Sequence, residues 1–138
     1  MGIEFKQGMP KILKIYQKAI TGDHDAIKYM SDYYDKKQKP KKALEWFIFG
    51  AQNGYIDFMK LICLQIIVIY NNFSDKDKEK LLILGLYWAN KYKEHCINND
   101  DVDLSNNIIT ALQKILAKHS YNTLLNSINL QKSHIPKL

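Results

Sequence analysis

The chain is poor in residues that break regular structure or form disulfide frameworks. Its 138 residues include 6 glycines, 3 prolines and 2 cysteines. So few turn-forming residues exclude an all-β protein with many tight turns. The two cysteines, Cys63 and Cys96, are too few for a disulfide framework and are typical of a reducing compartment.

Long apolar runs are also lacking. The most apolar stretch, residues 58–70, is interrupted by Lys60 and Gln65. As a helix it is too short to cross about 30 Å of hydrocarbon. The N-terminal sequence MGIEFKQGMPKILK has no apolar core of a secretory signal. We therefore expect a soluble cytoplasmic protein without a membrane partner.

The composition is otherwise that of a globular protein. Hydrophobic residues make up 46% and charged residues 25% of the chain. This balance excludes a chain that is mainly disordered, and the length is that of one ordinary domain spanning residues 1–138.

Apolar periodicity and end signals predict a succession of helices. They are expected over residues 10–20, 24–36, 41–53, 56–72, 75–96, 103–119 and 121–130. Gly22 and Gly54 are placed to end helices, while Asp23, Ser74 and Ser120 are placed to cap their starts. Periodicity alone does not separate a buried strand from a buried helix over 56–72, but the length and the flanking helices favour a helix. We predict an all-α fold.

One stretch carries the pattern of a packed helix pair. Small residues, aromatic residues and a closing glycine follow in the order Ala26, Met30, Ser31, Tyr34, Lys42, Ala43, Trp46, Phe47, Gly50, Ala51 and Gly54. The small residues allow two helices to approach closely, and Tyr34 and Trp46 are expected to fill the wedge between them.

This order resembles the Sel1-like repeat, a relative of the tetratricopeptide repeat. The family pattern A-x3-L-G-x2-Y, a loop, and K-A-x2-W-Y-x2-A-A-x2-G is met over residues 26–54, with departures at Met30, Ser31, Phe47 and Gly50. A weaker second copy places Trp88 and Ala89 42 positions after Trp46 and Phe47, with Gly85 in place of Ala43, and lacks the closing A-A-x2-G.

The resemblance implies a helix-turn-helix solenoid. Its parts would be an N-terminal helix over 10–21, a first unit over 22–54, a degenerate second unit over 55–97 and a capping helix pair over 102–131. Sel1-like proteins are mostly adaptors, so the resemblance implies protein binding.

Known catalytic and cofactor-binding motifs are missing from the sequence. It contains no G-x-G-x-x-G, G-x-x-x-x-G-K-[ST], G-x-S-x-G or H-E-x-x-H motif. Its histidines are scattered, and His95-Cys96 is the one adjacent pair of ligand types, where a structural zinc needs four ligands. Cys63 lies in an apolar run and is expected to be a core residue. We predict no enzyme activity, metal or cofactor.

The net charge is +6, and all 20 basic residues counted in it are lysines, because no arginine occurs. Five lysines lie in the sequence KKQKPKK, at Lys36, Lys37, Lys39, Lys41 and Lys42. Lysines near tyrosines can serve a nucleic-acid-binding protein, and this alternative stays open. Against it, base-edge and forked phosphate recognition favour arginine.

Tyrosine is abundant, with nine residues in the chain. Tyrosine is enriched at protein interfaces because it buries a large area at low rotamer cost. A binding face is predicted on the first helix of the first unit and its neighbour, formed by Tyr29, Asp32, Tyr33, Lys36 and Lys60. The alternative is that the tyrosines simply pack against the preceding helix.

These observations predict a non-catalytic module that binds another protein, favouring a partner with an acidic patch. Small Sel1-like proteins of this kind resemble the immunity proteins that neutralise bacterial toxins, so the partner could be a secreted toxin domain. The alternatives are a regulatory adaptor or scaffold in bacterial signalling, and a lysine-rich nucleic-acid-binding protein.

Overall fold

A computed structural model describes residues 10–130 of the chain, with side chains through residue 120. The predicted absence of a signal in the first residues, and the end of the predicted cap at residue 131, lie outside this range. No strand occurs between residues 10 and 130, which confirms the all-α prediction. The chain divides into two compact units, residues 1–65 and 66–138, and the border falls within one helix.

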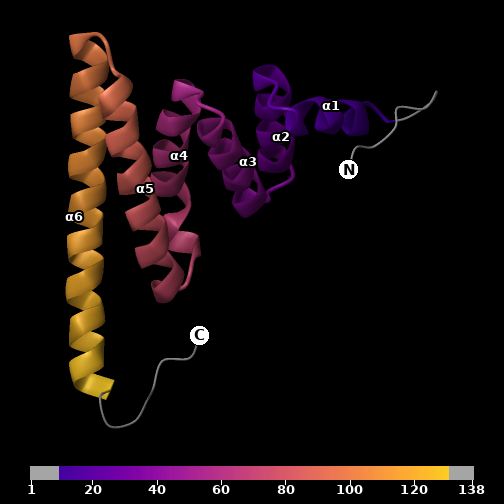
Figure 1. Cartoon of the computed structure of the whole chain (residues 1–138). Helices are drawn as coiled ribbons and strands as arrows, with labels where there is room; N and C mark the ends of the chain where they lie inside the picture. The colour runs from indigo at the N-terminus through magenta and orange to yellow at the C-terminus, as the bar shows by residue number, and fades with distance from the viewer. Residues whose placement is uncertain (1–9, 131–138) are drawn as a thin grey trace. The chain divides into compact units, whose positions relative to one another are not determined.

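The first unit contains three complete helices and the start of a fourth (Figure 1). They are α1 (Lys11–Ile20), α2 (His24–Lys36), α3 (Pro40–Gln52) and α4 (Ile56–Ile69), of which residues 56–65 belong to this unit. Consecutive helices pack on one another, α1 on α2 and α2 on α3.

The ends of these helices follow the predicted signals. The Asp23 carboxylate accepts a hydrogen bond from the Ala26 N–H at 2.9 Å and caps α2. Gly22 and Gly54 end α1 and α3 with φ of +97° and +90°, a backbone conformation that favours glycine. The turn after α2 instead places Gln38 in the left-handed region, with φ of +58°.

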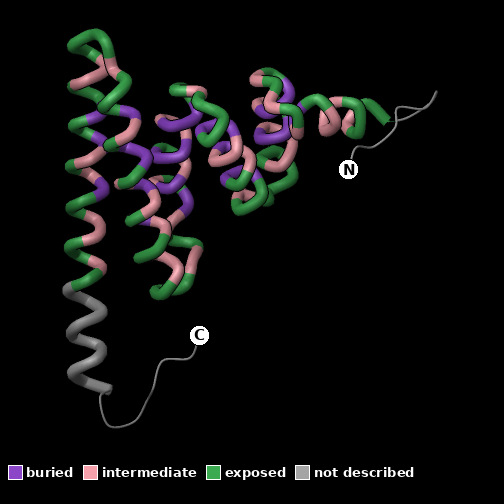
Figure 2. Tube along the Cα trace, in the orientation of Figure 1, coloured by how far each residue is buried: buried purple, intermediate pink, exposed green. Residues whose placement is uncertain are grey.

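The core of the first unit contains both small and large apolar residues. The buried residues lie along one side of α2 and α3 (Figure 2): they include Ala26, Ile27, Met30, Ala43, Leu44, Phe47 and Ala51. The ring of Phe58, from α4, packs directly on the backbone of Gly50. A Cβ added at Gly50 would lie 2.5 Å from this ring, so glycine is needed where the resembled family has alanine.

Helices α2 and α4 of the first unit run side by side in the same direction. His24 near the start of α2 contacts Asp57 near the start of α4, and Gln65 donates a hydrogen bond to Asp35 at 3.1 Å further along both helices. This is the arrangement expected when the first helices of two successive helix pairs lie next to each other.

The second unit contains the end of α4, a 3-10 turn η1 (Tyr70–Asn72), α5 (Asp75–His95) and α6 (Asn99–Leu130). Helices α5 and α6 pack on each other. Gly85 lets them approach closely, because a Cβ there would already lie 3.3 Å from the Leu112 side chain. The Ser74 hydroxyl accepts a hydrogen bond from the Asp77 N–H and caps α5, as predicted.

The C-terminal helices differ from the prediction. Helix α6 begins at Asn99 rather than at 103, because the Asn98 side chain accepts a hydrogen bond from the Asp101 N–H at 2.8 Å and caps it. The predicted break at Ser120 was also wrong, since α6 continues without interruption to Leu130. No glycine or proline occurs between residues 99 and 130, so nothing stops the helix there. The predicted helix over 56–72 is α-helical to Ile69 and then tightens into η1.

Candidate functional site

The first unit contains an open hollow of about 500 Å³, within the range typical of ligand sites. We call it the aromatic hollow. It is lined by Tyr16 and Ile20 of α1, Tyr34 of α2, and Lys42, Glu45, Trp46 and Phe49 of α3. Most of these side chains present apolar or aromatic surface.

The α3 wall of the hollow is a single helix face. Its residues Lys42, Glu45, Trp46 and Phe49 recur at steps of three and four, so their side chains lie above one another. The Trp46 ring stands nearly perpendicular to the Tyr16 ring, at 5.9 Å between centroids, and to the Phe49 ring, at 5.8 Å. Edge-to-face contacts of this kind hold the rings in fixed positions.

The polar groups of the hollow lie at its solvent side. Lys42 Nζ lies 3.7 Å from a Glu45 carboxylate oxygen, and the two side chains are 59% and 68% exposed. A pair this exposed contributes little to stability, so both charges remain able to exchange partners.

The structure changes the expected role of Tyr34 and Trp46. The sequence pattern predicts that both fill the wedge between two helices, but both are half-buried and line the open hollow. Trp88, at the corresponding position of the second copy, is only 8% exposed. The difference leaves aromatic surface accessible in the first unit.

A lysine-rich turn adjoins the hollow. We call residues 36–42 the lysine turn: this segment runs from the last residue of α2, through the connection, into the first turn of α3. It contains Lys36, Lys37, Lys39, Lys41 and Lys42. The Lys39 N–H donates a hydrogen bond to the Tyr34 carbonyl at 2.9 Å, which ties the turn to the residue in the hollow wall. The lysine turn and the aromatic hollow adjoin at Lys42, which belongs to both.

Four residues of the predicted binding face lie on α2 and the fifth, Lys60, lies on α4. Tyr29, Asp32 and Lys36 recur at steps of three and four along α2; Tyr29 is 39% exposed, Lys36 is exposed and Asp32 is half-buried. Tyr33 is half-buried and packs edge-on against Tyr34, at 5.2 Å between centroids. Lys60 lies on α4 and is half-buried.

Several side chains of this face have contacts within the chain. Asp32 pairs with Lys28 at 2.9 Å, and Lys11 Nζ lies 5.5 Å from the centroid of the Tyr29 ring. Lys37 Nζ lies 4.9 Å from the Tyr33 ring. None of the five predicted residues lines the aromatic hollow.

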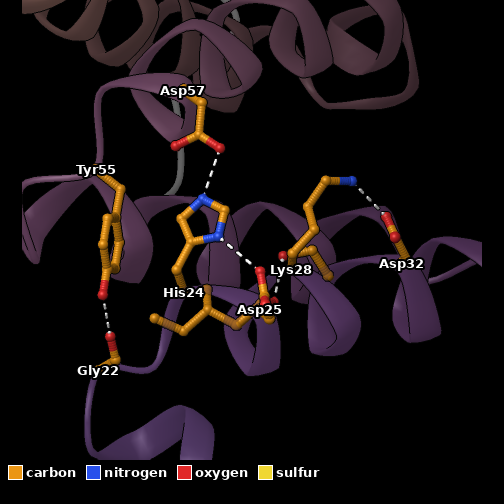
Figure 3. A network of polar contacts seen from close by, with 9 residues as sticks. Gly22, His24, Asp25, Lys28, Asp32, Tyr55 and Asp57 are labelled. Carbon is orange, nitrogen blue, oxygen red and sulfur yellow. Dashed lines mark hydrogen bonds and ion pairs between the residues drawn. The ribbon is translucent and has the colours of Figure 1, made fainter.

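A histidine clamp, which sequence reasoning missed, joins α2 to α4 (Figure 3). His24 Nε2 lies 2.7 Å from an Asp57 carboxylate oxygen, and His24 Nδ1 lies 3.2 Å from Asp25. Hydrogen bonding to Asp57, and then to Asp25, raises the pKa of His24 above its usual 6.5. The contact with Asp57 links α2 to α4 through the imidazole, while Asp25, the next residue of α2, contacts the other ring nitrogen.

Aromatic rings surround the histidine clamp. The His24 ring packs edge-on against Tyr55, at 4.7 Å between centroids, and lies tilted against Phe58, at 5.0 Å. The Tyr55 hydroxyl donates a hydrogen bond to the Gly22 carbonyl at 2.6 Å (Figure 3). The clamp joins His24 to Asp57, 33 positions away, and no sequence motif predicts a contact at this spacing.

The thiol of Cys63 is a core group. Its side chain is fully buried and donates a hydrogen bond to the Met59 carbonyl at 3.3 Å. Burial raises the pKa of Cys63 to about 12, so the thiol stays protonated and is a poor nucleophile at neutral pH. Within residues 10–120, no three His, Cys, Asp or Glu side chains are grouped so as to hold a metal ion.

No protein-family model, curated protein or solved structure matches this chain. The resemblance to the Sel1-like repeat therefore rests on the motif residues themselves. Among the described helices, none is both long and apolar enough to span a membrane.

Proposed function

We propose that this chain is a non-catalytic protein-binding module and that a segment of its partner docks in the aromatic hollow. The observation that carries the proposal is the accessible ring surface of Tyr16, Tyr34, Trp46 and Phe49 around an open volume of about 500 Å³. Partly exposed aromatic residues gathered in a pocket are typical of the few positions that dominate the affinity of protein interfaces.

Preorganisation of the hollow supports the proposal. Its walls come from three consecutive helices, and edge-to-face contacts hold the Trp46 ring on two sides. A partner segment would meet side chains already in place, so little conformational entropy would be lost on binding.

The helix arrangement of the first unit supports a repeat of the Sel1-like kind. The contacts from His24 to Asp57 and from Gln65 to Asp35 align α2 with α4, as expected for successive helix pairs. Repeats of this type expose extended helix faces to protein partners. Adaptor function is what the resemblance implies, and it agrees with the proposed use of the hollow.

The proposal is tested with matched variants of the tagged chain. A partner protein is first isolated from lysate of the source organism, and its Kd is then measured for the parent chain and for Trp46→Ala. Removing a central aromatic anchor is expected to weaken binding about thirty-fold or more. Circular dichroism of the variant verifies that it keeps its helix content.

The control separates the two candidate surfaces. The double variant Tyr29→Ala/Asp32→Ala changes the face predicted from the sequence. It leaves intact the seven residues of the hollow and Tyr33, which packs on Tyr34. The proposal expects it to bind within a few-fold of the parent chain. Loss of binding in the double variant, with Trp46→Ala unaffected, would move the site to the exposed face of α2.

The identity of the partner stays a prediction. The toxin-immunity hypothesis expects a tight equimolar complex with the product of a neighbouring gene and protection of cells that express that product. A complex without protection would favour the adaptor alternative, and salt-sensitive binding of random oligonucleotides would favour the nucleic-acid alternative.

A further inference from the structure

The lysines beside the aromatic hollow indicate which kind of ligand binds there. The lysine turn, residues 36–42, contains five lysines within seven residues and no acidic residue, and it includes the end of α2 and the start of α3. We propose that the occupant of the hollow is an acidic segment of a partner protein that inserts one bulky apolar side chain between the rings. This inference rests on the proposed function and specifies the chemistry of the partner.

The geometry connects the basic turn to the apolar hollow. Lys42 belongs to both, since it lines the hollow and ends the run of lysines. Gln38, in the left-handed conformation, reverses the chain so that the Lys39 N–H bonds to the Tyr34 carbonyl. A segment seated against Tyr34 would therefore have lysine side chains next to it on the turn.

The hollow itself selects an apolar anchor. Ile20 and the rings of Tyr16, Trp46 and Phe49 offer mostly apolar surface, and burial of one large side chain there removes a substantial area from water. A cationic anchor is disfavoured, because Lys42 lines the hollow and further lysines lie close to it in sequence.

The same surface is less suited to nucleic acid. The rings in the hollow stand edge to face, at interplanar angles of 88°, rather than as open platforms for successive bases. Carboxylates along a peptide, by contrast, pair with lysines on the turn while the anchor enters the hollow.

The experiment selects peptides against the whole chain. A display library of random short peptides is enriched on the parent protein, and the enriched peptides are synthesised with a fluorescent label. Their Kd values are measured by anisotropy for the parent, for Trp46→Ala and for Lys36→Glu/Lys39→Glu. The double charge reversal uses two exposed lysines that lie outside the hollow, so its fold is expected to be unchanged.

The expected result is enrichment of peptides with a net negative charge and a Trp, Phe or Leu anchor. Their affinity should fall about thirty-fold or more in Trp46→Ala and about tenfold in Lys36→Glu/Lys39→Glu. The binding should also weaken as salt is raised, because the rim charges are exposed and screened. The charge-matched control Lys93→Glu/Lys114→Glu, on exposed positions of α5 and α6, should bind within about twofold of the parent.

The outcomes separate this inference from the proposed function. Enriched peptides that need Trp46 but carry neutral or basic sequences would overturn the acidic partner and leave the hollow as a protein-binding site. Failure to enrich any peptide that depends on Trp46 would overturn the proposed function as well. Binding of a mixed-sequence single-stranded DNA that Lys36→Glu/Lys39→Glu abolishes and Trp46→Ala does not, with no acidic peptide enriched, would assign the lysine turn to nucleic acid.

Discussion

Gly50→Ala should destabilise the protein, although alanine is the better helix former. Gly50 lies in α3, and glycine in a helix interior normally costs about 0.5–1 kcal/mol relative to alanine. Here the new Cβ would lie 2.5 Å from Cδ2 and 2.6 Å from Cγ of the Phe58 ring. These distances are about 1 Å shorter than an ordinary carbon–carbon contact.

The Phe58 ring lies among other rings in the core. It is fully buried, and its neighbours include the Phe47 ring at 6.0 Å, the Tyr55 ring at 6.1 Å and the His24 ring at 5.0 Å between centroids. Overpacking a core by one methyl group costs about 1–3 kcal/mol. After the gain in helix propensity, we expect a net loss of up to about 2.5 kcal/mol in the free energy of unfolding.

The assay is urea unfolding followed by circular dichroism, with Gly85→Ala as the matched control. A Cβ at Gly85 would lie 3.3–3.4 Å from the ends of the flexible Leu112 and Ile66 side chains, so this variant should stay within about 0.5 kcal/mol of the parent or gain stability. Adding Phe58→Leu to Gly50→Ala should relieve the overlap, with a coupling of at least about 0.5 kcal/mol. A Gly50→Ala variant more stable than the parent would refute the packing argument.

Three further perturbations test the described geometry. Gln38→Gly should raise the free energy of unfolding by about 1 kcal/mol in urea titrations, because glycine adopts a φ of +58° without steric cost; an unchanged or lower stability would contradict this. Asp57→Asn should lose up to about 1 kcal/mol relative to the parent below about pH 6.5, where His24 is charged, and the loss should fade as the pH rises through the raised pKa of His24. An equal loss at alkaline pH would mean that the link is not ionic. Iodoacetamide should modify the half-buried Cys96 well before Cys63, whose burial raises its pKa to about 12, and mass spectrometry of native protein that shows equal rates would contradict the buried core.

Most of the helical order could be predicted because its signals are local. Gly22 and Gly54 end helices through their own backbone conformation, and Asp23 and Ser74 cap the helices that follow them. The errors in the C-terminal part have a local cause as well. Asn98 and Ser120 are residues that occur in turns, at helix starts and, less often, inside helices; Asn98 caps α6, whereas Ser120 lies inside it.

The candidate site was harder to predict because it depends on non-local packing. The spacing of Trp46 and Phe49 places them on one face of a helix, but only the position of α1 decides whether that face is covered. The pairing of His24 with Asp57 likewise joins residues 33 positions apart. The number of tyrosines can be read from the sequence, whereas the exposure of an aromatic ring depends on how the helices pack.

The most direct test of the proposed binding site uses Trp46 as its own reporter. In a Trp88→Phe background, Trp46 is the single tryptophan of the chain. The tightest enriched acidic peptide, chosen without tryptophan, is titrated while Trp46 emission and the anisotropy of the peptide label are recorded together. The account predicts that both signals change over the same concentration range and saturate at one peptide per chain. Saturation of the anisotropy with no change in Trp46 emission would show that the peptide binds elsewhere and would contradict the account.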